Sequence, residues 1–269
     1  MTIENKEPRK RFLALDTSTA TLGVAITENH RVVHEINASG ERNHSVHLLP
    51  IIEQALQASG TTGSELGGIS VGIGPGSYTG TRIAVSAAKT LAWAWNIPVA
   101  GVSSLQALAW GGLMKGWAES QSLNQDQQGH DWIIPLLDAR RGQAYTALFV
   151  SDGVNSPQRL APDAIRLMVD WVQQLDKLLQ QAKADGNQPR CLWFVGETEL
   201  HASEESLAPL RGITDIKTMP YELEGRWTGF LGEERHSHGS DDIHSLIPNY
   251  TQLSEAEANL RKTPEGGSK

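Results

Sequence analysis

The sequence predicts an α/β fold in which helices pack on a mixed sheet. Three short apolar runs near the N-terminus are joined by tight polar connections, which predicts an antiparallel meander of strands. Beyond them, apolar residues at helical spacing alternate with short apolar runs, and this order is typical of helices that cover a sheet. At 269 residues, 39% of them hydrophobic, the chain is long enough for one large domain or two small ones.

In the first half, three strands are followed by helix, strand, helix and strand. The predicted strands are 12–15, 22–26, 31–36, 69–73 and 99–102, and the predicted helices are 44–58 and 81–95. The first of these helices is predicted because its apolar residues, which include Leu48, Ile52 and Ala55, recur at helical spacing. We assign 12–110 to an N-terminal subdomain.

The second half mixes the same elements less clearly. A helix is predicted from 103 to 110, and the polar stretch 111–131, rich in Gln and Asn, is interpreted as a loop or insertion. The later predicted elements are strands 133–137, 144–149, 191–195 and 215–217, helix 163–184, loop 222–245 and a short closing helix at 253–262. We therefore expect a C-terminal subdomain at 111–250, the closing helix within 251–262, and disordered tails at 1–11 and 263–269. Two similar halves, the second degraded, agree with this order, although the residues contain no strong internal repeat.

Charge and composition exclude several classes of function. The net charge of −8 argues against a broad nucleic-acid footprint on this chain alone, but it is compatible with a basic partner subunit. The single cysteine, Cys191, cannot form an internal disulfide, and it lies in an apolar run that predicts burial. Residues 1–11 are charged and do not form a secretory signal, and no apolar stretch reaches the length of a membrane span. We expect a cytoplasmic protein.

The most informative segment runs from Gly72 to Arg82, with the sequence Gly-Ile-Gly-Pro-Gly-Ser-Tyr-Thr-Gly-Thr-Arg. It predicts a strand, a glycine-rich turn and a helix capped by Ser77 or Thr79, but it matches neither standard nucleotide-binding fingerprint. The smallest side chains of the helix recur every four residues: Gly80, Ala84, Ala88 and Ala92. Such a ridge could admit a partner helix at short range, or it could pack as an ordinary buried helix within its own domain.

Two polar turns follow strands in the two halves. Asp16, Thr17, Ser18 and Thr19 form a turn suited to phosphate, with an acidic residue and hydroxyl groups at a strand end; alternatively, their side chains bond their own backbone. The second turn, Asp138-Ala-Arg-Arg-Gly-Gln, has two arginines where a phosphate turn would have glycine and hydroxyl residues. A working two-sided ATPase cleft is therefore not expected, and Arg140 and Arg141 either face a partner or anion or belong to a charged hairpin turn.

The histidines and possible nucleophiles give no catalytic pattern. His44 and His47 could share a helix face, but no third metal ligand is nearby and the zinc-protease pattern is absent. His236, His238 and His244 are interpreted as solvated residues of a loop. No Ser/His/Asp set can be assigned, and no nucleophile elbow occurs.

Several segments of the chain resemble the TsaB family, once called YeaZ. The resemblance is carried by Leu13-Ala-Leu-Asp-Thr-Ser-Thr19, Arg42-Asn-His-Ser45, Leu48-Leu-Pro50, Gly74-Pro-Gly-Ser-Tyr-Thr-Gly-Thr-Arg82, Ala88-Lys-Thr-Leu-Ala92, Gly101-Val-Ser-Ser-Leu105, Asp138-Ala-Arg140, Pro248-Asn-Tyr250 and Ser254-Glu-Ala-Glu257. It is dense over 12–108 and thin afterwards. It implies an actin-like ATPase (ribonuclease H-like) fold in two subdomains of mixed sheet with flanking helices.

The resemblance also implies a function. It implies a non-catalytic subunit, an inactive paralogue of TsaD, in the threonylcarbamoylation of the adenosine beside the anticodon of tRNAs that read codons beginning with A. TsaD would carry the metal and transfer the threonylcarbamoyl group, and the small ATPase TsaE would bind to the pair. This chain would contact tRNA only indirectly, through the complex. In isolation the chain could form a homodimer. No cofactor is required by this chain, although ATP or ADP could bind at the partner interface.

The resemblance places the partner interface on the N-terminal helices. The expected interface residues are His44, Leu48, Gly74, Gly76, Ser77, Tyr78, Thr79, Gly80, Arg82, Ala84, Ala88 and Ala92. Two other functions remain open. One is an independent ATP-dependent enzyme of the sugar-kinase or actin-like class, which would need a second phosphate turn. The other is a protease, for which the residues offer neither a metal site nor a nucleophile.

Overall fold

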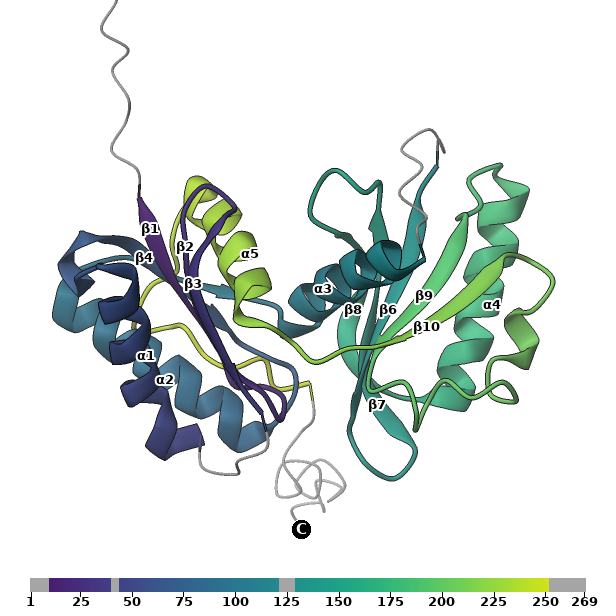
Figure 1. The fold of residues 1–269 in the computed structure, drawn as a ribbon. Helices are drawn as coiled ribbons and strands as arrows, with labels where there is room; N and C mark the ends of the chain where they lie inside the picture. The colour runs from purple at the N-terminus through teal and green to yellow at the C-terminus, as the bar shows by residue number, and fades with distance from the viewer. Residues whose placement is uncertain (1–9, 40–43, 121–128, 252–269) are drawn as a thin grey trace, which may run out of the picture.

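The computed structural model describes residues 10–39, 44–120 and 129–251, which form two sheets with helices around them (Figure 1). The elements of the first sheet and its flanking helices are β1 (Arg11–Asp16), β2 (Leu22–Thr27), β3 (Val32–Ala38), α1 (His44–Ser59), β4 (Leu66–Gly72), α2 (Tyr78–Trp95) and β5 (Val99–Val102). The remaining elements are α3 (Ser104–Glu119), β6 (Asp131–Asp138), β7 (Gln143–Ser151), β8 (Gln158–Leu167), α4 (Met168–Ala184), β9 (Cys191–Gly196), β10 (Asp215–Pro220) and α5 (Gly225–His238). Short 3-10 helices lie at Gly63–Glu65 and Ala208–Leu210.

The two sheets have the same strand order. The first runs β3-β2-β1-β4-β5 and the second β8-β7-β6-β9-β10. In each, an antiparallel meander of three strands is extended by two parallel strands. The two similar halves that the order of elements suggested are therefore present, and β6 corresponds to β1. This correspondence puts Asp16 and Asp138 at the ends of equivalent strands.

Helices α3 and α5 cross between the halves (Figure 1). Helix α3 follows the last strand of the first sheet but packs on β6 and β9 of the second, while α5 follows the second sheet and packs on β1, β2 and β4 of the first. The two helices also contact each other. Because each subdomain supplies a helix to the other sheet, the two subdomains are joined by contacts between residues distant in sequence.

Helices α3 and α5 overlap the loops predicted at 111–131 and 222–245, so the loop predictions are wrong for 111–119 and 225–238. The stretch 111–131 was interpreted as a loop because it is rich in Gln and Asn, but its first residues continue α3, in which Gly112 and Gly116 lie so close to Val195 and Trp193 that a Cβ would overlap those side chains. In α5, a Cβ on Gly232 would likewise overlap Ser70 of β4. These glycines permit close helix-to-sheet packing instead of marking loops. Helix α5, which lies within the C-terminal subdomain expected at 111–250, packs on the first sheet.

Two further differences concern element ends. The predicted helix 163–184 begins only at Met168, because 158–167 form strand β8, whose exposed and half-buried residues at the sheet edge carry a weak apolar signal. Arg11, predicted in a disordered tail, begins β1. The closing helix 253–262, the tail 263–269 and residues 121–128 of the predicted insertion lie outside the described residues.

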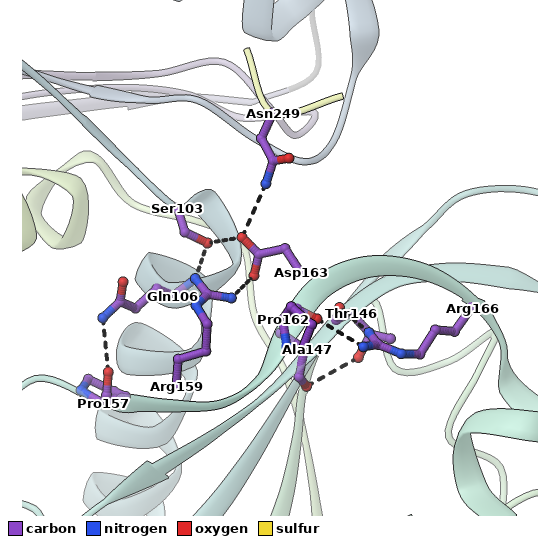
Figure 2. A network of polar contacts seen from close by, with 10 residues as sticks. All are labelled: Ser103, Gln106, Thr146, Ala147, Pro157, Arg159, Pro162, Asp163, Arg166 and Asn249. Carbon is purple, nitrogen blue, oxygen red and sulfur yellow. Dashed lines mark hydrogen bonds and ion pairs between the residues drawn. The ribbon is translucent and has the colours of Figure 1, made fainter. Parts of the chain in front are cut away.

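The last described segment, 239–251, returns to the first subdomain. Asp241 N donates to Val99 O at 2.9 Å, and Asn249 N donates to Ile73 O at 2.7 Å. Figure 2 shows how Asn249 also reaches the second subdomain: its Nδ2 donates to Asp163 Oδ2 at 3.3 Å. Ser103 Oγ donates to the same oxygen at 2.8 Å, and Arg159 pairs with the other oxygen. The Asp163 carboxylate therefore fastens strand β8 to the N-terminus of α3 and to the returning segment.

Within the described ranges, none of the helices combines the length and apolar character needed to cross a bilayer.

Candidate functional site

The turn of Asp16, Thr17, Ser18 and Thr19, which we call the aspartate turn, packs against the glycine-rich loop at the ends of β1 and β4. Thr17 Oγ1 donates to Gly80 O at 2.6 Å, and Ser77 N donates to Ser18 O at 2.7 Å. A Cβ on Gly76 or Gly80 would overlap the carbonyl oxygens of this turn. The glycines therefore allow a close approach between two segments of the same chain.

Asp16 lies at the centre of this contact and is 2% exposed. Its Oδ1 accepts a hydrogen bond from Ser18 N at 2.8 Å. Its Oδ2 accepts from Ser104 Oγ at 2.7 Å and from Thr228 Oγ1 at 3.4 Å. Burial raises the pKa of Asp16, while the hydrogen bonds from these three residues oppose that effect. The carboxylate thus joins β1 to both crossing helices, α3 and α5.

These contacts bear on the predicted phosphate turn. Asp16, Thr17 and Ser18 are buried, and Thr19 is half-buried. The bond from Ser18 N to Asp16 and the bond from Thr21 N to Thr19 Oγ1, at 3.2 Å, are those of a turn that bonds its own backbone. The contacts therefore agree with the alternative interpretation of this turn, and phosphate binding stays a prediction that would require the turn to open.

The small-residue ridge of α2 faces the core of its own subunit. Ala84, Ala88 and Ala92 are each 0% exposed, and Gly80 is buried against the aspartate turn. They pack in the cluster that contains Leu13, Leu15 and Val71 of the first sheet. As a surface for a partner helix this ridge was the wrong choice; the alternative, a buried helix face, is what the structure contains.

The exposed groove of this subdomain lies between α1 and α2, on the neighbouring ridge of α2. One part of it encloses about 420 Å³. It is lined by Ser45, Leu48, Leu49, Tyr78, Thr79, Arg82, Ile83, Ser86 and Ala87. A second hollow of about 470 Å³ shares Leu49 and continues to Leu91 and Trp95. Leu49 is 56% exposed and Tyr78 is 53% exposed, so apolar surface is open to solvent here. We call this surface the α1–α2 groove.

Four of the twelve predicted interface residues line the α1–α2 groove: Leu48, Tyr78, Thr79 and Arg82. Arg82 lies over the Tyr78 ring at 4.0 Å, and its Nε donates to Tyr250 Oη at 2.8 Å. Tyr250 belongs to the returning segment, so this end of the groove is connected to Asn249 and thereby to Asp163. No sequence pattern indicates that connection.

Apart from Ala84, Ala88 and Ala92 in the core, the other predicted interface residues lie around the aspartate turn. Ser77 caps α2 by accepting from Gly80 N at 3.2 Å, and Gly74 N donates to Ser104 Oγ at 3.1 Å. His44 Nε2 lies 3.2 Å from Thr19 O. These residues hold the base of α2 and the start of α1 in place, next to the groove but outside its lining.

The second turn is built differently. Asp138 Oδ1 accepts from Arg140 N at 3.0 Å and lies 3.1 Å from Nε2 of the buried His201. Asp138 N donates to Glu197 Oε2 at 2.5 Å. Arg140 and Arg141 are exposed. Sequence reasoning missed His201 and Glu197, because they follow β9 some sixty residues later and only the fold brings them to Asp138.

No metal centre is present among residues 10–39, 44–120 and 129–251: they contain no group of three or more His, Cys, Asp or Glu side chains placed to hold an ion. His236, predicted to be solvated, is instead half-buried in α5, where it stacks on Phe12 with ring centroids 5.0 Å apart. Burial lowers the pKa of His236. Cys191 is buried as predicted, and burial raises the pKa of its thiol to about 12, which makes it a poor nucleophile.

Comparison with known proteins places these features in context. The family model described as "TsaD: tRNA N6-adenosine threonylcarbamoyltransferase" matches residues 31–202. The tRNA threonylcarbamoyladenosine biosynthesis protein TsaB of Bacillus subtilis is 34% identical over 254 residues, which cover 92% of this chain and 96% of that protein. The Escherichia coli protein of the same name is 33% identical over 145 residues, or 53% of this chain and 56% of that protein.

Two solved structures have a similar fold. YeaZ from Pseudomonas aeruginosa superimposes with a TM-score of 0.64 at 19% identity, over 90% of this chain and 99% of that one. A second P. aeruginosa structure, described as similar to peptidase YEAZ, has a TM-score of 0.66 at 21% identity, over 90% and 100% of the two chains. With the repeated strand order, these similarities confirm the expected fold of two mixed-sheet subdomains with flanking helices, which this chain shares with YeaZ.

Proposed function

Because the chain belongs to the TsaB family of tRNA threonylcarbamoyladenosine biosynthesis proteins, we propose that it is the non-catalytic subunit that binds and activates TsaD. The observation that carries this proposal is the α1–α2 groove. It is lined on two helices of the N-terminal subdomain by the exposed Leu49 and Tyr78 and by the half-buried Ile83 and Ala87. Exposed apolar surface of this kind is typical of a protein interface.

The occupant of the groove is the corresponding pair of helices of TsaD. The TsaD family model matches residues 31–202, a range that contains both α1 and α2. TsaD therefore has counterparts of these helices, and two related chains can pair through equivalent faces about a pseudo-twofold axis. The same reasoning allows a homodimer of this chain when TsaD is absent. TsaE and tRNA bind to the complex of this chain with TsaD, which forms in the cytoplasm. If ATP or ADP binds, its site is the interface between the two chains.

Two features support a non-catalytic role. The aspartate turn is closed by Gly72, Gly76 and Gly80, which lie against Asp16, Ser18 and Thr17. The equivalent turn of the second subdomain carries Arg140 and Arg141 in place of glycine and hydroxyl residues. Phosphoryl transfer requires donors on both sides of the transferred group. We expect little or no ATP turnover by the isolated chain.

Coexpression with TsaD, followed by size analysis, tests the partnership. The proposal expects a stable complex, and tRNA modification that requires both chains. The competing function, an independent ATP-dependent enzyme, expects steady ATP hydrolysis by the purified chain that disappears in Asp16→Ala. Such hydrolysis, or failure to associate with TsaD, would contradict the proposal.

A further inference from the structure

The turn between β6 and β7 has an unusual backbone. Gln143 N donates to Arg140 O at 3.0 Å, and the two residues between them, Arg141 and Gly142, have φ of 55° and 72°. Arg140 itself has φ of 67°. Two consecutive arginines thus occupy the left-handed region, which residues other than glycine and asparagine rarely adopt.

Ordinary turn chemistry does not account for these arginines. A hairpin turn with positive φ at both central residues favours Asn-Gly, so asparagine at Arg141 would suit this backbone better. Strained residues of this kind persist where neighbouring structure holds them in place, and they cluster at functional positions. A residue type that disagrees with its local conformation is therefore a reason to look for a ligand.

The surroundings hold the turn but leave the guanidinium groups available. Asp138 Oδ1 is engaged by Arg140 N and His201, and Glu197 Oε2 by Asp138 N. Ala139 N donates to Gln143 O at 2.9 Å, which closes the base of the turn. Both arginine side chains are exposed, and neither forms an ion pair or hydrogen bond with any other residue in the part of the chain that the structure describes.

We propose that Arg140 and Arg141 bind backbone phosphates of the tRNA held by the complex. A guanidinium is always charged and matches a phosphate with two parallel hydrogen bonds. Because both stand on one turn whose backbone is already held in place, binding has to order only their side chains. This proposal rests on the proposed function, because that function brings tRNA to the complex. It goes further in giving this chain a direct contact with the RNA. Because the chain has a net charge of −8, its contact with the RNA is confined to this turn and does not extend over a broad basic surface.

The test measures binding of tRNA to the complex of this chain with TsaD, over a range of salt concentrations. The variant Arg140→Gln/Arg141→Gln removes the two charges. The control, Lys177→Gln/Lys183→Gln, removes two exposed charges from α4 of the same subdomain. Each phosphate contact contributes about 0.7–0.9 to the slope of log K against log salt. The arginine variant should therefore reduce the slope by about 1.4–1.8, while the control keeps the wild-type slope.

A second variant separates the charge from the shape of the turn. Arg141→Asn creates the favoured Asn-Gly pair, so it should melt at or above the wild-type temperature and still bind tRNA more weakly. Three results would overturn the proposal: an unchanged salt slope, an equal change in the lysine control, or a wild-type complex that retains no tRNA. Loss of affinity for TsaD in the arginine variant would also overturn it, because the turn would then bind a protein. If the wild-type chain does not bind TsaD at all, it is the proposed function that has failed.

Discussion

Two adjacent alanines of α2 separate the groove from the core. Ala87 lines the α1–α2 groove, whereas Ala88 is 0% exposed and packs in the subunit core. The same substitution, alanine to leucine, should therefore affect different properties at the two positions. At Ala87 the added atoms occupy space in the groove that a partner helix would need. At Ala88 they crowd the interior of the subunit.

The expected magnitudes are similar, but they appear in different assays. Overpacking costs about 1–3 kcal/mol at a close contact. For Ala87→Leu this cost falls on association, so the Kd for TsaD should rise by about 5–150-fold, at 1.4 kcal/mol per factor of ten. For Ala88→Leu it falls on folding, and the Tm should drop by about 2–4 °C for each kcal/mol. Titration calorimetry with TsaD and thermal unfolding by circular dichroism measure the two effects.

The reasoning would be refuted by the opposite assignment. If Ala87→Leu binds TsaD as tightly as wild type while Ala88→Leu weakens binding without lowering the Tm, the partner uses the other ridge of α2. A large drop in Tm for Ala87→Leu would mean that this position is not open in solution.

Three other predictions concern stability. Because the folded-state pKa of Asp16 is raised, the stability of the wild-type chain relative to Asp16→Asn should increase as pH falls toward about 3.9. This gain in stability should be lost as pH rises through the folded-state pKa. Urea unfolding at several pH values measures this dependence, and a gain in relative stability with rising pH would contradict the prediction. Asp163→Ala leaves Ser103 and Asn249 without their acceptor, so urea unfolding should give about 1–3 kcal/mol less stability, whereas Asp170→Asn on the exposed face of α4 should change little. Gly232→Ala should cost about 1–3 kcal/mol and speed hydrogen exchange in α5, because its Cβ would overlap Ser70; exchange as slow as in wild type would show that the helix can shift to make room.

The sequence predicted some elements well because their patterns are local. Strand β5 was predicted with its observed bounds, and β1, β2, β4 and β9 within a few residues, since each is a buried apolar run. Helix α3 was shortened because the stretch 111–131 is rich in Gln and Asn, and α5 was missed because Gly232 belongs to a helix face that meets a sheet closely, whereas glycine ordinarily disfavours helix. Local propensity does not contain that tertiary reason.

The candidate site was predicted in part for a similar reason. The spacing of Gly80, Ala84, Ala88 and Ala92 correctly indicates a close helix contact, but it does not tell whether the neighbour is the chain's own sheet or a partner. The groove uses the ridge one residue earlier, with Thr79, Ile83 and Ala87. The contacts of Asp163 with Asn249 and of Asp138 with His201 join residues more than sixty positions apart, so only the fold shows them.

Hydrogen exchange with and without TsaD tests the central claim most directly. If the α1–α2 groove is the docking surface, adding TsaD should slow exchange of amides in His44–Ser59 and Tyr78–Trp95, and leave the turn at 139–143 unchanged until tRNA is added. Protection confined to the second subdomain, with both helices exchanging as in the free chain, would contradict the account.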